Sequence, residues 1–281
     1  MREVATDPPP APKTRSRAPA AGPRVLVADD NAVVLQVTVA MLGQMGCRVM
    51  AVTGGLLALE ALSTGDFDLA LLDCRMPDLD GIRAVRAFRE LEQGRGDRRL
   101  PIVALSGNTD AVDRSACRDA GMDGFLGKPF GQLDLLETVR RFVPNAVQPA
   151  GAPVVAPLRA PSFEPGAAID RRVLAELEAM RPGLRDRVFA LFLRDSPALV
   201  ATIVRAAATL DESELTRSAH RLKSGAANLG ARRMVRLCDA LEAIGRGAEA
   251  ARAVELATEL DRELAAVTAE IDELKRPEPA T

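Results

Sequence analysis

Three aspartates in the N-terminal half of the chain have the chemistry to hold a cation and to accept a phosphoryl group. Asp29 and Asp30 are adjacent, and Asp73 stands alone further along. Packed together, three carboxylates repel one another unless a cation lies among them, and a hard divalent ion such as Mg2+ prefers oxygen ligands. Ser106 and Lys128 could add a hydroxyl group and a positive charge beside Asp73. Because a metal ion and Lys128 would neutralise the charge that develops in phosphoryl transfer, Asp73 is the candidate nucleophile.

These residues can meet only if parallel strands deliver them to one edge of a sheet. Short β-rich runs, each followed by a stretch with helical spacing, occur at Arg24–Ala28, Cys47–Val52, Leu69–Asp73, Ile102–Ser106 and Gly124–Gly127. The first helical stretch, residues 31–45, has a core-facing stripe at Val34, Val37, Met41 and Met45. This alternation predicts an α/β domain with a doubly wound five-stranded parallel sheet. Ligands of such sheets bind beyond the carboxyl ends of the strands, where the five polar residues lie.

His220 is the only histidine of the chain. On a helical wheel the apolar stripe consists of Leu215, Ala219, Leu222, Ala226 and Leu229. His220 lies about 140° from the centre of that stripe and is expected to face solvent. Small neighbours (Thr216, Ser224 and Ala227) and nearby cations (Lys223 and Arg217) would let an anionic partner reach the imidazole. Taken alone, an exposed histidine most often has no role, just as aspartates at strand ends often only cap helices.

Composition and charge restrict the function classes. The 281 residues contain 37 Lys plus Arg and 39 Asp plus Glu, so no global positive field would attract nucleic acid or anionic lipid. No apolar run reaches the ~20 residues of a membrane span, and the first residues lack a secretory signal, so a cytoplasmic protein is expected. The four cysteines are scattered without C-x-x-C spacing and are expected to be buried thiols.

Shifts in composition divide the chain into two domains. Residues 1–22 form an Ala/Pro-rich arm that is expected to be disordered, and residues 23–143 form the α/β domain. A Pro-rich linker over residues 144–165 leads to a helical domain over 166–275 and a short tail over 276–281. Helix starts are predicted at Asp170 and at Asp211, the latter with Glu214 in the position of a capping box.

The N-terminal domain resembles the receiver domain of two-component response regulators. The resemblance is carried by the run LALLDCRMPDLDGI around Asp73, the Asp29-Asp30 pair, Ser106 and the GKPF sequence that contains Lys128. It implies a flavodoxin-like fold in which Asp30, Asp73 and the backbone carbonyl of Arg75 ligate Mg2+ directly and Asp29 does so through water. It also implies that Ser106 and Phe125 form the conformational switch. Phe125 replaces a tyrosine of that family, so a signal through a ring hydroxyl is excluded.

The segment AHRLKSGAANLGA resembles the active helix of histidine-containing phosphotransfer (HPt) domains. His220, Leu222, Lys223, Ser224 and the Leu229-Gly230 pair match the motif, although Ser224 stands where the family often has glycine. The resemblance implies an all-α antiparallel four-helix bundle with a leading helix. It makes His220 the phosphohistidine and Lys223, Ser224 and Ala227 part of the docking surface.

Together the two resemblances indicate a phosphorelay protein that moves a phosphoryl group between Asp73 and His220, in one chain or between chains. Such a protein would catalyse its own transfer and would need a sensor histidine kinase in trans and a downstream response regulator receiver as partners. No glycine-rich ATP-binding boxes of a kinase domain are found. The alternative is a DNA-binding response regulator, in which Arg232, Arg233 and Arg236 would belong to a recognition helix. Residues 166–281 contain 18 Lys plus Arg and 19 Asp plus Glu, a balance that argues against nucleic-acid binding.

Overall fold

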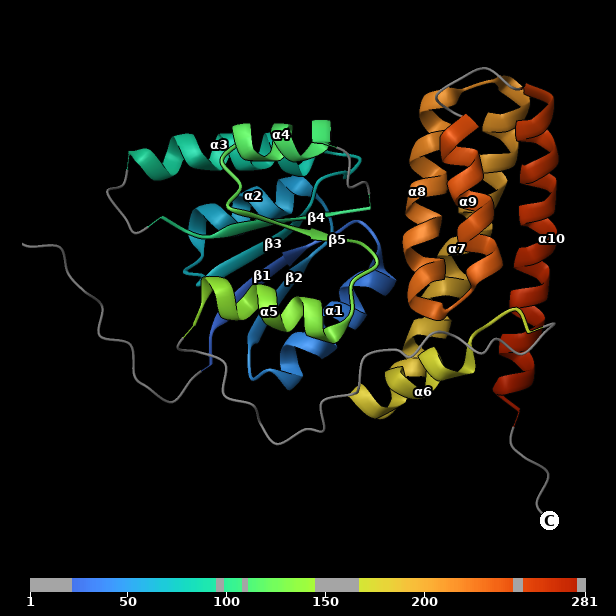
Figure 1. Ribbon diagram of the computed structural model, residues 1–281, viewed down its shortest axis with the longest axis horizontal. Coiled ribbons are helices and arrows are strands. Elements are labelled where there is room, and N and C mark those ends of the chain that lie inside the picture. Colours follow the sequence, from blue (N-terminus) through green and yellow to red (C-terminus); the bar gives the residue numbers. More distant parts are fainter. Residues whose placement is uncertain (1–21, 95–98, 108–110, 145–166, 245–249, 277–281) are drawn as a thin grey trace, which may run out of the picture.

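The computed structural model describes residues 22–94, 99–107, 111–144, 167–244 and 250–276. The predicted arm, linker and tail fall almost entirely outside these residues. Figure 1 shows an α/β domain beside a bundle of long helices. Among the described residues, no helix has the length and apolar character needed to cross a membrane.

The N-terminal domain is built on a parallel sheet with strand order β2-β1-β3-β4-β5. The strands are β1 (Arg24–Ala28), β2 (Arg48–Val52), β3 (Leu69–Asp73), β4 (Ile102–Ser106) and β5 (Gly124–Gly127). β3 and β4 are buried along their whole length, as expected for apolar strands covered by helices on both faces. The predicted fold class is thereby confirmed, with β2 beginning one residue later than expected.

Five helices cover the sheet. α1 (Ala32–Gln44) and α5 (Gln132–Phe142) lie on one face, and α2 (Gly55–Thr64), α3 (Gly81–Gln93) and α4 (Ala111–Asp119) lie on the other. α1 begins at Asn31, whose side-chain oxygen accepts hydrogen bonds from the amides of Val33 and Val34. This cap fixes the direction of the chain directly after the Asp29-Asp30 pair.

The C-terminal domain is a four-helix bundle preceded by a short helix, as predicted. α6 (Arg171–Met180) leads into α7 (Leu184–Thr209), α8 (Glu212–Leu229), α9 (Arg232–Ile244) and α10 (Ala250–Leu274). Asp170 and Asp211 cap α6 and α8 as expected. The expected capping box is wrong in one respect, because the Glu214 carboxylate accepts bonds from Arg217 and Ser218 within α8 instead of from the cap.

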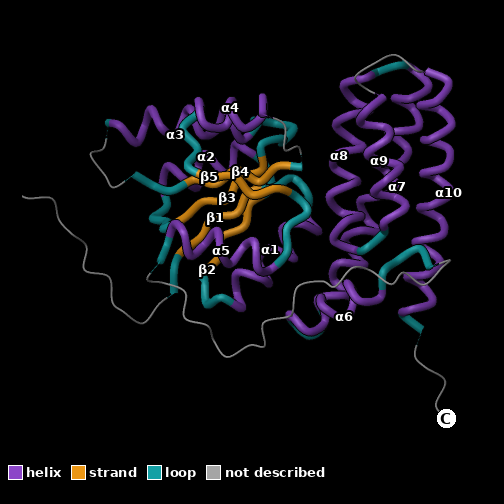
Figure 2. Tube along the Cα trace, viewed as in Figure 1, coloured by secondary structure: helices purple, strands orange, loops and turns teal. Residues whose placement is uncertain are grey.

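α1 packs against both domains. One face of α1 packs on the sheet and the other lies against α6, α7 and α8, as Figure 2 lets the reader follow. The apolar core runs through this contact without a break, from the strands through Val33 to Phe192 of α7. All four cysteines are buried free thiols, as expected.

Candidate functional site

The predicted acidic residues converge at the carboxyl end of the sheet. Asp29, Asp30 and Asp73 each offer an oxygen, and these oxygens lie within 4.8 Å of one another. The Lys128 ammonium bridges two of them, with Nζ 2.5 Å from Asp29 Oδ2 and 2.8 Å from Asp73 Oδ2. Asp29, Asp73 and Lys128 are almost completely removed from solvent. Such a cluster is unstable electrostatically without compensating positive charge.

Burial and mutual repulsion raise the pKa values of the acidic cluster. Burial of Asp29 raises its pKa to about 7, with Asp73 adding repulsion and Lys128 opposing the rise. Burial, followed by the charge of Asp73, also raises the pKa of Asp30. Burial alone would lower the pKa of Lys128, but the two carboxylates raise it above its ordinary value. Lys128 therefore compensates Asp29 and Asp73, Arg221 lies 3.5 Å from Asp30, and the oxygen donors of the three aspartates fit an additional hard divalent ion.

The other sequence-predicted residues surround this cluster. Ser106 is buried at the end of β4, where its carbonyl accepts a hydrogen bond from the Lys128 amide. The Arg75 amide donates to Asp73 Oδ1 at 3.1 Å, so the Arg75 backbone lies beside the candidate nucleophile. Phe125 is half-buried on β5, and the Arg114 guanidinium lies 5.0 Å from its ring centroid.

His220 does not face solvent, and this expectation is wrong. The side chains of the predicted apolar stripe are buried as expected, but His220 is itself only 5% exposed. It is covered by the N-terminal domain, where Gly107 follows Ser106. A Cβ atom on Gly107 would lie 2.5 Å from His220 Cε1, so only glycine permits this approach. Helical periodicity located the outward face of α8 correctly and could not reveal that a second domain covers it.

Glu242 was missed by the sequence analysis. It projects from α9, and its Oε1 lies 3.3 Å from His220 Nδ1 and 2.7 Å from Lys223 Nζ. Burial would raise the pKa of Glu242, but the bonds and charges of His220 and Lys223 hold it below its ordinary value. One signal was available. Met234, Cys238 and Glu242 recur every fourth residue, which places a carboxylate in line with the buried stripe of α9.

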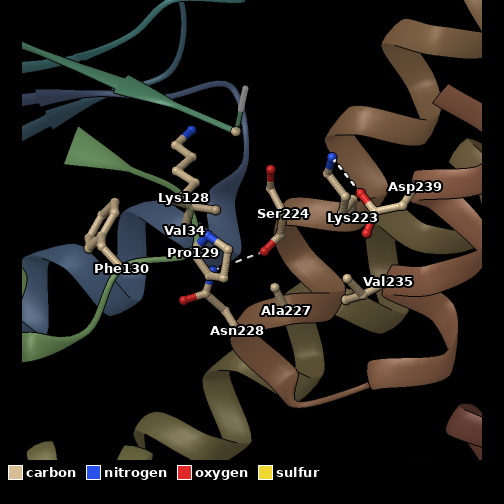
Figure 3. Close-up of a pocket in the computed structure, with 11 residues that line it drawn as sticks. Val34, Lys128, Pro129, Phe130, Lys223, Ser224, Ala227, Asn228, Val235 and Asp239 are labelled. Carbon is tan, nitrogen blue, oxygen red and sulfur yellow. Dashed lines mark hydrogen bonds and ion pairs between the residues drawn. The ribbon is translucent and has the colours of Figure 1, made fainter. Parts of the chain in front are cut away.

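The predicted docking residues line a pocket of about 230 Å³ between the domains. In Figure 3, Ser224 and Ala227 of α8 lie opposite Pro129, which follows Lys128. Lys223 points away toward α9, where its Nζ is 2.9 Å from Asp239 Oδ1. A second pocket, of about 610 Å³, is bordered by His220 and Arg221 from the bundle and by Asp30 and Arg75 from the α/β domain.

Comparison with known protein families identifies both domains. Residues 25–140 match the response regulator receiver domain family, and residues 187–274 match the Hpt domain family. The chain carries a receiver domain followed by an Hpt domain. Because long bundle helices and an Hpt match occupy the described part of the C-terminal domain, the helix-turn-helix alternative finds no support.

Several relatives, among them sensor histidine kinases, are much longer than this chain. The sensor histidine kinase GacS of Pseudomonas protegens is 32% identical over 253 residues, which are 88% of this chain and 27% of GacS. The sensory/regulatory protein RpfC of Xanthomonas campestris is 33% identical over 78% of this chain, and the match spans 30% of RpfC. These likenesses and the two domains together assign the chain to the phosphorelay proteins of two-component systems.

A solved structure also resembles the receiver domain. It is the receiver domain of the sensor histidine kinase PA1611 from Pseudomonas aeruginosa, described with a magnesium ion coordinated in its active site cleft. It is 40% identical, covers 43% of this chain and 98% of its own length, and has a TM-score of 0.40.

Proposed function

We propose that this phosphorelay protein accepts a phosphoryl group on Asp73 of its receiver domain and exchanges it with His220 of its own Hpt domain. The observation that carries the proposal is the contact between Gly107 and His220. It sets the imidazole against the residue that follows Ser106, at the mouth of the acidic cluster. Transfer of a group between two side chains requires this kind of approach.

Each receiver residue has a separate role in forming the acyl phosphate. Asp73 supplies the attacking oxygen, while Lys128 and the Ser106 hydroxyl would hold the oxygens of the incoming phosphoryl group. Asp30, Asp73 and the Arg75 carbonyl would hold Mg2+ directly, with Asp29 acting through water. A bound Mg2+ ion would supply positive charge that neutralises the phosphoryl oxygens.

In this proposal Glu242 orients the imidazole of His220. If His220 is neutral and its Nδ1–H is directed to Glu242, the lone pair of Nε2 is free to attack phosphorus. The bond from phosphorus to the Asp73 oxygen then breaks as the bond to Nε2 forms, and the carboxylate is regenerated. The positive charge of Lys223 stabilises the ionised carboxylate of Glu242.

We further propose partners that act before and after this exchange. A sensor histidine kinase acting in trans would load Asp73, and a receiver of a downstream response regulator would take the group from His220. The relatedness to GacS and RpfC supports kinases and regulators of this type as partners.

The test is to follow both phosphorylated residues in the full chain with a radiolabelled acyl phosphate as donor. Wild type should acquire acid-stable label on Asp73 and then acid-labile, alkali-stable label on His220. Asp73→Asn should acquire neither, because an amide is not a nucleophile, and a chelator of Mg2+ should act in the same way. His220→Gln should keep only the alkali-labile label. Undiminished labelling of the Asp73→Asn chain would place the acceptor elsewhere.

A further inference from the structure

α1 has an unusual composition for a helix on the surface of an α/β domain. Its sequence AVVLQVTVAMLGQ contains no charged residue, and apolar side chains are distributed around its whole circumference. A helix of this kind must be covered on both faces. The sheet covers one face, and the Hpt helices α7 and α8 cover the other. The second face of α1 is therefore an interaction surface for the Hpt domain.

One polar side chain, that of Asn31, fixes where α1 packs along α8. The Oδ1 atom of Asn31 is used as the cap of α1, while its Nδ2 donates to the backbone carbonyl of Arg221 at 2.8 Å. Gly225 leaves room for that approach, because a Cβ atom on it would lie 3.2 Å from Nδ2, a tighter contact than ordinary packing. A glycine inside a helix costs about 1 kcal/mol relative to alanine. The space that the Asn31 amide occupies explains why α8 has a glycine at this position.

The Arg221 side chain in turn binds the receiver domain. Its Nη2 donates to the backbone carbonyl of Asp30 at 3.1 Å, and its Nε lies 3.5 Å from Asp30 Oδ2. Asp30 and Asn31 are consecutive, and Arg221 follows His220 directly. The contact therefore fixes the start of α1 relative to the residue next to the imidazole.

We propose that Asn31 and Arg221, with Gly225 between them, form the specificity-determining contact by which this Hpt domain selects a receiver domain. The inference rests on the proposed exchange between Asp73 and His220 and names what the partner must carry. A receiver that serves His220, in this chain or another, needs a side-chain amide at the start of its first helix, directly after the aspartate that the metal site already requires. The amide satisfies the Arg221 carbonyl, and the acidic position accepts the guanidinium.

The composition of the chain allows a direct measurement of docking. His220 is the only histidine and there is no tyrosine, so diethyl pyrocarbonate gives one absorbance signal at the imidazole. Because docking buries His220, its carbethoxylation rate in the full, unphosphorylated chain reports the undocked population. A Gly107→Leu chain supplies the undocked reference, since its side chain would collide with the imidazole.

Asn31→Ser is the decisive variant. Serine keeps the cap of α1 but is too short to reach the Arg221 carbonyl. Loss of one neutral hydrogen bond should raise the carbethoxylation rate about fivefold, and Arg221→Ala, which removes a charged donor, should raise it more than tenfold. Arg252→Ala is the matched control, because Arg252 pairs with Glu255 on the exposed surface of α10 and should leave the rate unchanged. Each Hpt variant is compared with its own Gly107→Leu double variant to remove direct effects on the imidazole.

Two results would overturn the proposal. One is a wild-type rate equal to that of the Gly107→Leu chain, which would mean that docking is not populated. The other is an unchanged rate in both Asn31→Ser and Arg221→Ala. Neither result depends on phosphoryl transfer, so a wild-type chain that fails to label His220 would refute the proposed function and leave the docking result standing.

Discussion

At the scale of single residues, His220 lies beside a buried carboxylate from a neighbouring helix. Glu242 lies within reach of both His220 and Lys223, and all three side chains are mostly buried. A buried carboxylate is tolerated only when partners compensate the lost hydration. Glu242 is thus a stabilising group of the bundle and, in the proposed function, the group that would orient the imidazole.

Replacing Glu242 with glutamine should lower the free energy of unfolding by about 2 kcal/mol at pH 7, because Lys223 loses its buried partner. Folding lowers the pKa of Glu242 from its ordinary value of 4.5. Its ionised form therefore stabilises the wild type above that value, and this stabilisation is lost as the pH falls through the lower folded pKa. Urea unfolding between pH 7 and pH 3 should show the difference between the two chains shrinking with acid. Glu255→Gln, an exposed change on α10, should shift stability by less than about 0.5 kcal/mol.

Lys128 gives a second prediction at this scale. Lys128→Met leaves Asp29 and Asp73 buried without their shared cation and should cost about 3 kcal/mol in the absence of divalent ions. Millimolar Mg2+ should restore much of that loss, because the ion supplies charge that the lysine no longer provides. Thermal unfolding with and without Mg2+ measures both effects. If Mg2+ leaves the melting temperature of the variant unchanged, the three aspartates do not form a cation site.

At the scale of elements, periodicity was enough for the strands and for the buried stripe of α8. The carboxyl ends of the strands brought Asp29, Asp73 and Lys128 together because parallel strands end at the same edge. The environment of His220 could not be predicted in the same way, since it depends on residues from α9 and from another domain. The charge-free sequence of α1 was a local signal for that second contact.

The outward face of α8 gives a prediction about docking. Ala227 lines the pocket beside Pro129, and a tryptophan there would fill the space that docking needs. Ala227→Trp should slow transfer from Asp73 to His220 at least tenfold, because the bulky indole ring would hold the two domains apart. Ala201→Trp on the exposed side of α7 is the matched control and should transfer normally. The chain has no other tryptophan, so fluorescence reports the surroundings of each introduced ring. Equal transfer by both variants would exclude this face from docking.

At the scale of the whole molecule, covalent linkage changes the kinetics of the relay. Two covalently joined domains meet at an effective concentration of order millimolar if the connecting residues can span the docked geometry. By residue count alone, the 22 residues from 144 to 165 allow a span of at most roughly 70 Å, which exceeds the size of either domain. Intramolecular transfer is then favoured over transfer between chains at micromolar protein.

Dilution separates the two routes. Transfer from Asp73 to His220 within one chain should keep the same rate constant at any protein concentration, whereas transfer between chains should slow in proportion. Mixing Asp73→Asn with His220→Gln chains permits only the second route, because each retains one half of the relay. At micromolar concentration this mixture should relay about a thousandfold more slowly than wild type, the ratio of millimolar to micromolar partner. A mixture as fast as the intact chain would mean that linkage gives no advantage, and the docked arrangement would then represent how two separate molecules meet.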